Sequence, residues 1–75
     1  MTLNDIRPGQ RCVVTGVTLK NSLRKRVLDM GITTGTTIYV RKLAPLGDPM
    51  EITIRGYELT LRKEEAKGIE VRKAV

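Results

Sequence analysis

The chain is short, basic and poor in the side chains that enzymes use. It has 75 residues, a mass of 8.4 kDa and a formal net charge of +6. A chain of this size buries only about 60% of its unfolded surface, which leaves no room for a deep substrate cavity beside a hydrophobic core. We therefore expect one domain over residues 1–75, and we expect that it is not an enzyme.

The residue counts exclude several kinds of site. The sequence has no His, no Trp and no Phe, and it has one Cys. The lack of His removes the usual acid–base group at neutral pH and the commonest transition-metal ligand. A single Cys excludes an intrachain disulfide and a cysteine-based zinc site, and it fits a reducing compartment. No apolar run approaches the roughly 18 residues of a membrane span, and the N-terminus lacks a signal-peptide pattern. We expect a cytoplasmic protein.

The charge balance indicates an acidic partner. The chain has 14 Lys and Arg residues against 8 Asp and Glu residues, and its isoelectric point is near 10.0. Such a balance is typical of proteins that bind nucleic acid, an anionic membrane surface or an acidic protein. Aromatic residues make up only 3% of the chain. This argues against a binder of single-stranded nucleic acid, because such proteins stack the bases on aromatic rings.

The N-terminal part of the chain predicts a helical turn, a strand and a short helix. Residues 2–6 begin with Thr and have Asp three residues later, which is the pattern of a helix cap. Residues 11–18 are rich in β-branched side chains and predict the first strand. Asn21 or Ser22 can cap a helix that runs to about Met30.

That helix has one apolar and one basic side. Leu23, Val27 and Met30 recur at helical spacing, so this side is expected to pack on the rest of the protein. Gly31 follows at the place where a left-handed residue ends a helix. The basic residues lie mostly on the other side of the helix: Arg24, Lys25 and Arg26.

The central segments predict a second strand and a rigid loop. Residues 36–43 alternate between apolar and polar side chains and predict the second strand, with Ile38 and Val40 on the core side. Residues 44–49 contain two prolines and one glycine, which excludes a helix or a strand.

The segment from residue 51 to residue 62 predicts a β-hairpin. We place a two-residue type II′ turn at Gly56 and Tyr57, because that turn requires Gly in its first position. One face of the hairpin then holds four apolar residues, and the other holds a pair of threonines between two pairs of opposite charge. The facing pairs are Arg55 with Glu58, Ile54 with Leu59, Thr53 with Thr60, Ile52 with Leu61, and Glu51 with Arg62.

The remaining residues complete a small β fold. Residues 63–67 predict a tight turn or one helical turn, and residues 69–72 predict a final strand with Ile69 and Val71 facing inward. The sum is about five short strands with one short helix between the first two. A sheet this small must curl to cover its single apolar face. We expect a mainly β fold, a small and partly open β-barrel of the SH3-like kind.

Several segments of the chain occur in the order of one known family. Residues 28–32 read Leu-Asp-Met-Gly-Ile, and residues 44–49 read Ala-Pro-Leu-Gly-Asp-Pro. Residues 55–57 read Arg-Gly-Tyr, and residues 61–66 read Leu-Arg-Lys-Glu-Glu-Ala. Three positions near the start match the family's opening pattern: Leu3, Ile6 and Gly9. Over about residues 3–71 the chain resembles the FeoA family, the small cytoplasmic proteins of bacterial ferrous iron uptake.

This resemblance implies both a fold and a partner. It implies an SH3-like domain that works beside FeoB, a membrane transporter of ferrous iron with a cytosolic GTP-binding domain. FeoA-like domains are thought to modulate that transporter by protein contact. The same fold occurs as the C-terminal domain of DtxR-type metal-dependent repressors. The chain is thus expected to be a non-enzymatic regulatory protein that needs no cofactor and reaches the membrane only through the transporter.

Three features predict where such a partner binds. The stiff loop of Leu46 and Asp48 would present the leucine outward at little ordering cost, and Met50 follows it as a soft contact residue. Tyr57 either covers the end of the barrel or contacts the partner. The basic helix side would steer the approach, unless it is a solvated surface with no partner. Its residues are Arg24, Lys25 and Arg26, with Arg41 and Lys42 as further charges.

Two other functions stay open. One is a transition-metal sensor like the repressor domains, although the acidic residues show no ligand spacing and Cys12 is best interpreted as a small buried apolar residue. The other is a basic barrel that binds nucleic acid, which the low aromatic content disfavours. Unpaired edge strands would also let copies of the chain pair with one another, so homo-oligomers are a further option.

Overall fold

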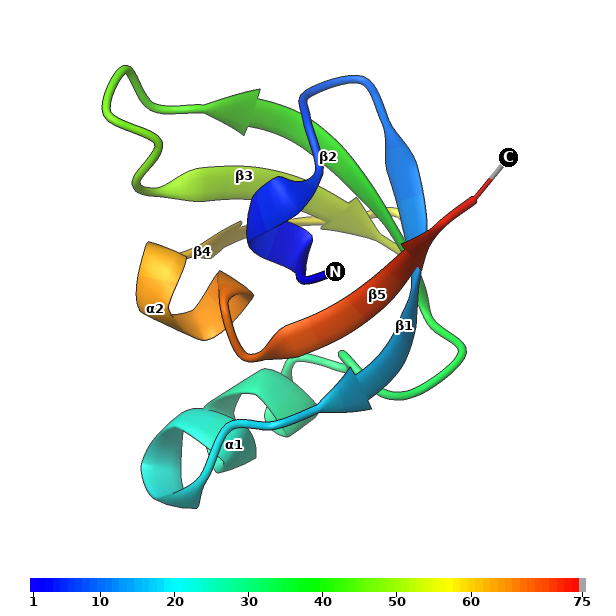
Figure 1. Ribbon diagram of the computed structural model, residues 1–75, viewed down its shortest axis with the longest axis vertical. Coiled ribbons are helices and arrows are strands. Elements are labelled where there is room, and N and C mark those ends of the chain that lie inside the picture. The colour runs from blue at the N-terminus through cyan, green and yellow to red at the C-terminus, as the bar shows by residue number, and fades with distance from the viewer. Residues whose placement is uncertain (75) are drawn as a thin grey trace.

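Five short strands form one antiparallel sheet in the order β4-β3-β2-β1-β5 (Figure 1). The computed structural model describes residues 1–74. A 3₁₀ turn precedes the sheet, a helix joins β1 to β2, and a single helical turn joins β4 to β5. This architecture confirms the predicted mainly β fold with one helix between the first two strands. The elements are η1 (Leu3–Asp5), β1 (Arg11–Val17), α1 (Asn21–Asp29), β2 (Thr37–Leu43), β3 (Met50–Ile54), β4 (Tyr57–Leu61), α2 (Lys63–Ala66) and β5 (Ile69–Lys73).

The core lies inside the curl of the sheet. Along β3 the side chains alternate between buried and half-buried from Met50 to Ile54, so every second residue faces inward. Every strand contributes to the core, and η1, α1 and α2 add Leu3, Val27 and Ala66. Burial of each large apolar side chain is worth about 1.5–3 kcal/mol, so this core is the main stabilising term.

The turn of the β3–β4 hairpin differs from the prediction. The two turn residues are Arg55 and Gly56, with φ of 51° and 85°. Positive φ at both positions is the mark of a type I′ turn, whose twist matches that of the flanking strands. Ile54 therefore pairs with Tyr57, and the predicted register is wrong by two residues. A shift of two keeps every side chain on its own face, so the alternation of the sequence could not detect the error.

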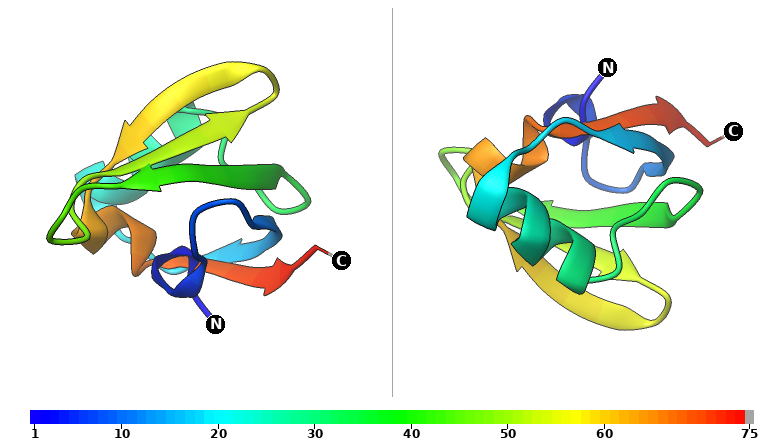
Figure 2. Two further views of the ribbon diagram at one scale, coloured as in Figure 1. Left: turned by 90° about the horizontal axis from the view of Figure 1, so that it is seen from above. Right: turned by 90° about the horizontal axis from the view of Figure 1, so that it is seen from below.

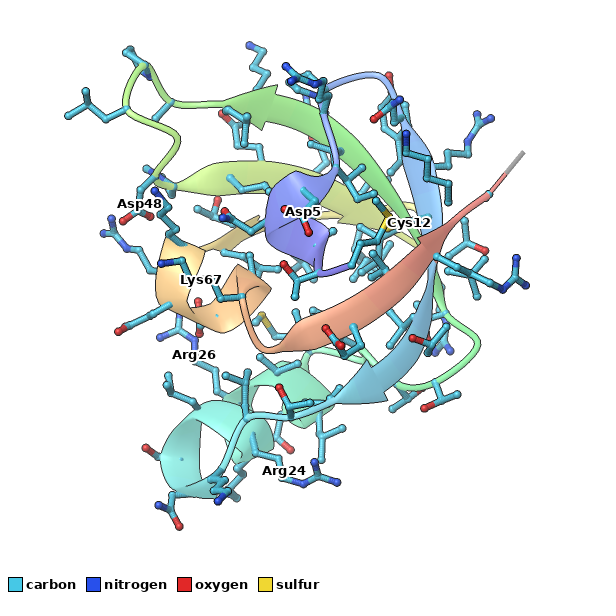
Figure 3. All side chains as sticks on the ribbon, viewed as in Figure 1. Asp5, Cys12, Arg24, Arg26, Asp48 and Lys67 are labelled. Carbon is cyan, nitrogen blue, oxygen red and sulfur yellow. The ribbon has the colours of Figure 1, made fainter. Side chains whose placement is uncertain are left out.

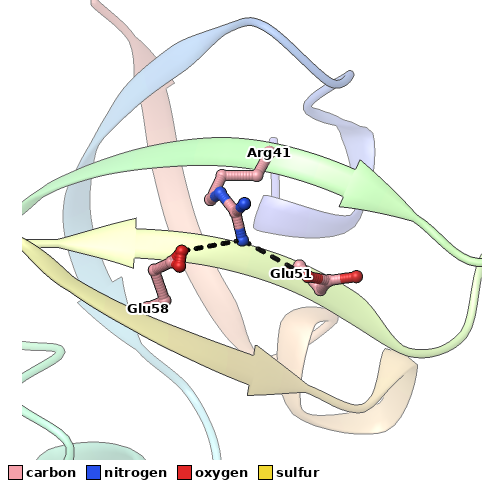
Figure 4. Close-up of polar contacts among 3 residues, drawn as sticks. All are labelled: Arg41, Glu51 and Glu58. Atoms are coloured by element: carbon pink, nitrogen blue, oxygen red, sulfur yellow. Dashed lines mark hydrogen bonds and ion pairs between the residues drawn. The ribbon is translucent and has the colours of Figure 1, made fainter.

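The charge pairs on the outer face of the hairpin are also different. The predicted pairs of Arg55 with Glu58 and of Glu51 with Arg62 do not form among the described residues. Instead Arg41 reaches across from β2, and its Nη1 lies 3.3 Å from Oε1 of Glu51 and 3.2 Å from Oε1 of Glu58 (Figure 4). One guanidinium thus links β2, β3 and β4 on the outer face of the sheet.

Helix α1 ends as predicted but begins differently. The residue before the helix is Lys20, and no side chain among residues 1–74 caps the helix, so the predicted cap by Asn21 or Ser22 is wrong. The segment just before the helix packs closely against the turn that precedes β5. A Cβ atom on Gly68 would lie 2.2 Å from the side chain of Leu19, which shows how closely the two segments approach.

The two edge strands of the sheet, β5 and β4, differ in whether another segment pairs with them. At the β5 edge, the backbone N–H of Val71 donates to the carbonyl oxygen of Met1 at 2.9 Å, and Thr2 pairs with Glu70. The N-terminal residues thus cover part of β5, at Glu70 and Val71. Within residues 1–74 no segment pairs with the outer edge of β4, and both views in Figure 2 show β4 at one edge of the sheet. Among the described residues, the β4 edge of the sheet is therefore open.

Candidate functional site

The loop between β2 and β3 projects one leucine into solvent. Leu46 is 90% exposed, more than any other large apolar residue among those described. The loop around it is braced from within, because the N–H of Gly47 donates to the carbonyl of Ala44 at 2.7 Å and the N–H of Ala44 donates to that of Pro49 at 3.1 Å. The predicted outward leucine on a stiff loop is confirmed as a structural feature.

Asp48 holds this loop against α2. Its Oδ1 accepts a hydrogen bond from the backbone N–H of Lys63 at 3.1 Å and lies 4.0 Å from Nη1 of Arg62. Figure 3 shows Asp48 directed toward the start of α2. The carboxylate therefore has a bracing role that the sequence analysis did not foresee, in addition to its place beside Leu46.

Met50 does not lie on the surface. It is 1% exposed and packs in the core as the first residue of β3, paired with Leu43 on one side and Leu61 on the other. The prediction that it contacts a partner is therefore wrong for its side chain. Met50 directly follows the loop in the sequence, but it is the first of the alternate residues of β3 whose side chains face the core.

Tyr57 lies at the other end of the hairpin from Leu46. It is 73% exposed and borders a shallow groove of about 380 Å³, together with Met30, Ile54 and Leu59. The two predicted contact residues therefore belong to two separate surfaces. Sequence reasoning missed the groove, because its walls come from the end of α1 and from β4, which are about 27 residues apart in the chain.

Two of the three predicted basic residues are exposed but locally engaged. Arg24 donates from Nη1 to the carbonyl oxygen of Val17 at 2.9 Å. Lys25 lies 3.9 Å from Asp29 one helical turn on, and both side chains are largely exposed. Solvent-exposed pairs of this kind contribute little to stability, so both charges stay available at the surface of α1.

Arg26 has a structural partner instead. Its Nε lies 3.1 Å from Oε2 of Glu65, a carboxylate that is 1% exposed. The other oxygen of Glu65 accepts the backbone N–H of Arg62 at 2.9 Å. Arg26 therefore joins α1 to α2 (Figure 3), and a buried glutamate in the Glu-Glu-Ala turn is a feature that sequence analysis did not predict.

A family model described as "FeoA domain" matches residues 1–73 of the chain. The chain belongs to the FeoA family. A fusion protein of Porphyromonas gingivalis that joins Fe(2+) transport protein A to the Fe(2+) transporter FeoB is 41% identical to it over 71 residues. That match covers 95% of this FeoA-family chain and 8% of the much longer fusion protein.

Solved FeoA structures have the same fold. The FeoA-like protein of Clostridium acetobutylicum has a TM-score of 0.92 and 40% identity, over 100% of this chain and 87% of that protein. FeoA of Stenotrophomonas maltophilia, described as a procaryotic SH3 domain protein and solved with zinc, has a TM-score of 0.84. Its identity is 24%, over 96% of this chain and 89% of its own. The predicted SH3-like fold is confirmed.

The described part of this FeoA-family chain gathers no cluster of metal-ligating groups. In residues 1–74 no three His, Cys, Asp or Glu side chains come together in a way that could hold an ion. Cys12 is fully buried, as predicted, and burial raises the pKa of its thiol to about 11. Among the same residues no helix is long and apolar enough to cross a bilayer.

Proposed function

We propose that this protein is a non-enzymatic accessory protein of ferrous iron uptake, which works in the cytoplasm by binding the cytosolic part of a FeoB-like transporter. The observation that carries the proposal is the projecting side chain of Leu46, 90% exposed on a braced loop. Family membership and the fusion of the two proteins into one chain in Porphyromonas gingivalis support the choice of partner.

Two physical arguments favour Leu46 as the main contact residue: the gain from burying its side chain and the small loss of backbone entropy. Full burial of a leucine side chain contributes about 1.5–3 kcal/mol. The hydrogen bonds of Gly47 and Asp48 already order the loop, so little backbone entropy is lost when a partner encloses the side chain. The charges of Arg24 and Lys25 on α1 would speed and orient the encounter with an acidic surface rather than tighten the complex.

The test is co-purification with the full-length transporter of the same organism. Leu46→Glu is expected to reduce recovery of the complex about tenfold, because a buried carboxylate would face the partner's apolar pocket. The matched control is Thr15→Glu, which places the same charge at an exposed position of β1. Both variants are expected to unfold at the wild-type temperature.

The other predicted contact surface gives the alternative outcome. If Leu46→Glu binds as well as the wild type, the loop is not in the interface, and Tyr57→Glu then tests the groove at the far end of the hairpin. If neither change weakens the complex while the wild-type protein still co-purifies, the contact lies elsewhere. Absence of any wild-type complex would contradict the proposed partner itself.

A further inference from the structure

We propose that the free edge of β4 pairs with β4 of a second copy of the chain, which forms a weak dimer with one continuous sheet. The inference is independent of the proposed function, since it concerns the protein alone. Its basis is the asymmetry of the sheet edges. Met1 and Thr2 pair with Glu70 and Val71 of β5, whereas no segment of residues 1–74 pairs with the outer edge of β4.

The hairpin register shows which backbone groups of β4 are free. In a hairpin closed by a two-residue turn, the pair that flanks the turn is hydrogen-bonded, and bonded pairs then alternate along the strands. Tyr57, Leu59 and Leu61 therefore bond to β3, and their pairing partners include Ile54 and Ile52. The N–H and C=O groups of Glu58 and Thr60 point the other way, toward the open edge.

Only one antiparallel register uses all four of these free groups. It places Glu58 of each copy opposite Thr60 of the other, so that both N–H groups and both C=O groups in each copy are bonded across the interface. The dyad axis then passes between the two Leu59 residues. A shift of two in one direction would place the two Glu58 side chains opposite each other, which like-charge repulsion disfavours.

A shift of two in the other direction loses backbone bonds. It would place Thr60 opposite Thr60 and Glu58 opposite Arg62 of the second copy. The N–H of Arg62 already donates to Glu65, and its carbonyl oxygen already accepts N–H groups of Glu65 and Ala66. In the favoured register Arg62 lies opposite Gly56 of the second copy, which has no side chain to repel it.

The side chains of the edge fit a second copy as well. On the inner face, half-buried Leu59 would meet Leu59 of the second copy, and exposed Tyr57 would lie opposite Leu61, whose own side chain is already buried in the core. The groove bordered by Tyr57, Leu59 and Met30 lies beside this row. On the outer face, Arg41 is shared between Glu51 and Glu58 and offsets only part of their charge. A five-residue strand buries little area, so the dimer is expected to be weak.

Disulfide cross-linking between introduced cysteines measures the register of the two β4 strands directly. Leu59→Cys, Glu58→Cys and Thr60→Cys are compared under mild oxidation with Thr15→Cys, an exposed residue of β1. Leu59 is expected to form disulfide dimers about tenfold faster than the other three, because residues on the dyad in a non-hydrogen-bonded pair come closest. The native Cys12 does not interfere, since it is buried and its pKa is raised.

Faster cross-linking at residue 58 or 60 would refute the register, and equal rates at all four positions would refute the dimer. A second measurement is sedimentation of the wild type, which is expected to be monomeric at about 10 µM and to dimerise toward about 1 mM. Thr60→Pro should abolish this association by removing one outward N–H, while Thr60→Val should preserve it. If the wild type stays monomeric at the highest concentration, the proposal is wrong. An extended segment of another protein would then be the candidate partner of the β4 edge.

Discussion

A single buried carboxylate, that of Glu65, decides how the two helices are held together. Its Oε2 atom is fully buried, and no well-aligned hydrogen bond from the described residues reaches it. Among residues 1–74, Arg26 at 3.1 Å is the one ion-pair partner of this carboxylate. An unpaired buried charge costs far more than a lost surface pair, so Arg26 differs in kind from its neighbour Lys25.

Removal of Arg26 is therefore expected to destabilise the protein. Arg26→Ala should lower the free energy of unfolding by about 1–3 kcal/mol, toward the lower end because the arginine side chain is 62% exposed and water screens the pair. The matched control, Lys25→Ala, breaks an exposed pair on the same helix and should cost less than about 0.5 kcal/mol. Urea unfolding measures both.

The double variant separates lost charge from lost packing. Glu65→Gln in the Arg26→Ala background removes the orphaned charge, so it should recover part of the lost stability. Equal costs for Arg26→Ala and Lys25→Ala would contradict the assignment of Arg26 to a structural role and would return it to the free basic surface of α1.

At the scale of elements, the turn of the β3–β4 hairpin carries a local strain. Arg55 has a φ of 51°, in the left-handed region where a residue with a long side chain is disfavoured. Gly56 follows with a φ of 85°. Type I′ turns strongly prefer Asn-Gly, so the sequence has the preferred second residue and an unfavourable first one.

This strain predicts two opposite effects on stability. Arg55→Asn should raise the free energy of unfolding by about 0.5–1 kcal/mol, because Asn tolerates the left-handed conformation. Gly56→Ala should lower it by about 1 kcal/mol or more, although nothing lies within 4 Å of the added Cβ, because the cost is conformational. Thermal or urea unfolding of both variants checks this. If Gly56→Ala is neutral, the turn is not type I′ in solution.

The same hairpin shows what sequence alone can predict about elements. Alternation located both strands and their inner faces, because every second residue of β3 from Met50 to Ile54 is apolar. It did not fix the register, since a shift of two residues preserves all faces. The register depends on the turn type, because Gly56 fits the first position of a type II′ turn and the second position of a type I′ turn.

The helix boundaries show the same limit. Gly31 marked the end of α1 correctly, because a left-handed residue with φ of 87° is a local requirement that only a few residue types meet. The cap at the start was wrong: the residue before α1 is Lys20, and Leu19 beside it packs closely against Gly68. These residues lie about 50 positions apart, and no local pattern reports such a contact.

At the scale of the whole molecule, some features of the candidate site follow from the local sequence, and others depend on contacts between distant segments. The projection of Leu46 was predictable, because the two prolines and the glycine around it specify a stiff loop without reference to the rest of the fold. The burial of Met50, the engagement of Arg26 by Glu65 and the groove beside Tyr57 were not, because each depends on which distant segment packs against it.

The packing of the whole molecule also predicts that it folds without a metal ion. Fifteen apolar residues within residues 1–74 are buried, and they extend from Leu3 to Val71. No group of metal-ligating side chains forms among the same residues. Stability that comes from apolar burial does not depend on free metal, whereas a structural ion supplies folding free energy that a chelator removes.

The melting temperature is therefore expected to change by less than about 1 °C when about 1 mM EDTA is added. The change is expected to be equally small when about 1 mM Zn²⁺, Mn²⁺ or anaerobic Fe²⁺ is added in place of EDTA. Differential scanning fluorimetry or calorimetry measures the shift. A fall of more than about 5 °C with EDTA would reveal a structural ion that the described residues do not show. A rise of that size with one ion alone would favour the metal-sensor function over the accessory role, because a ligand stabilises only a folded state that binds it.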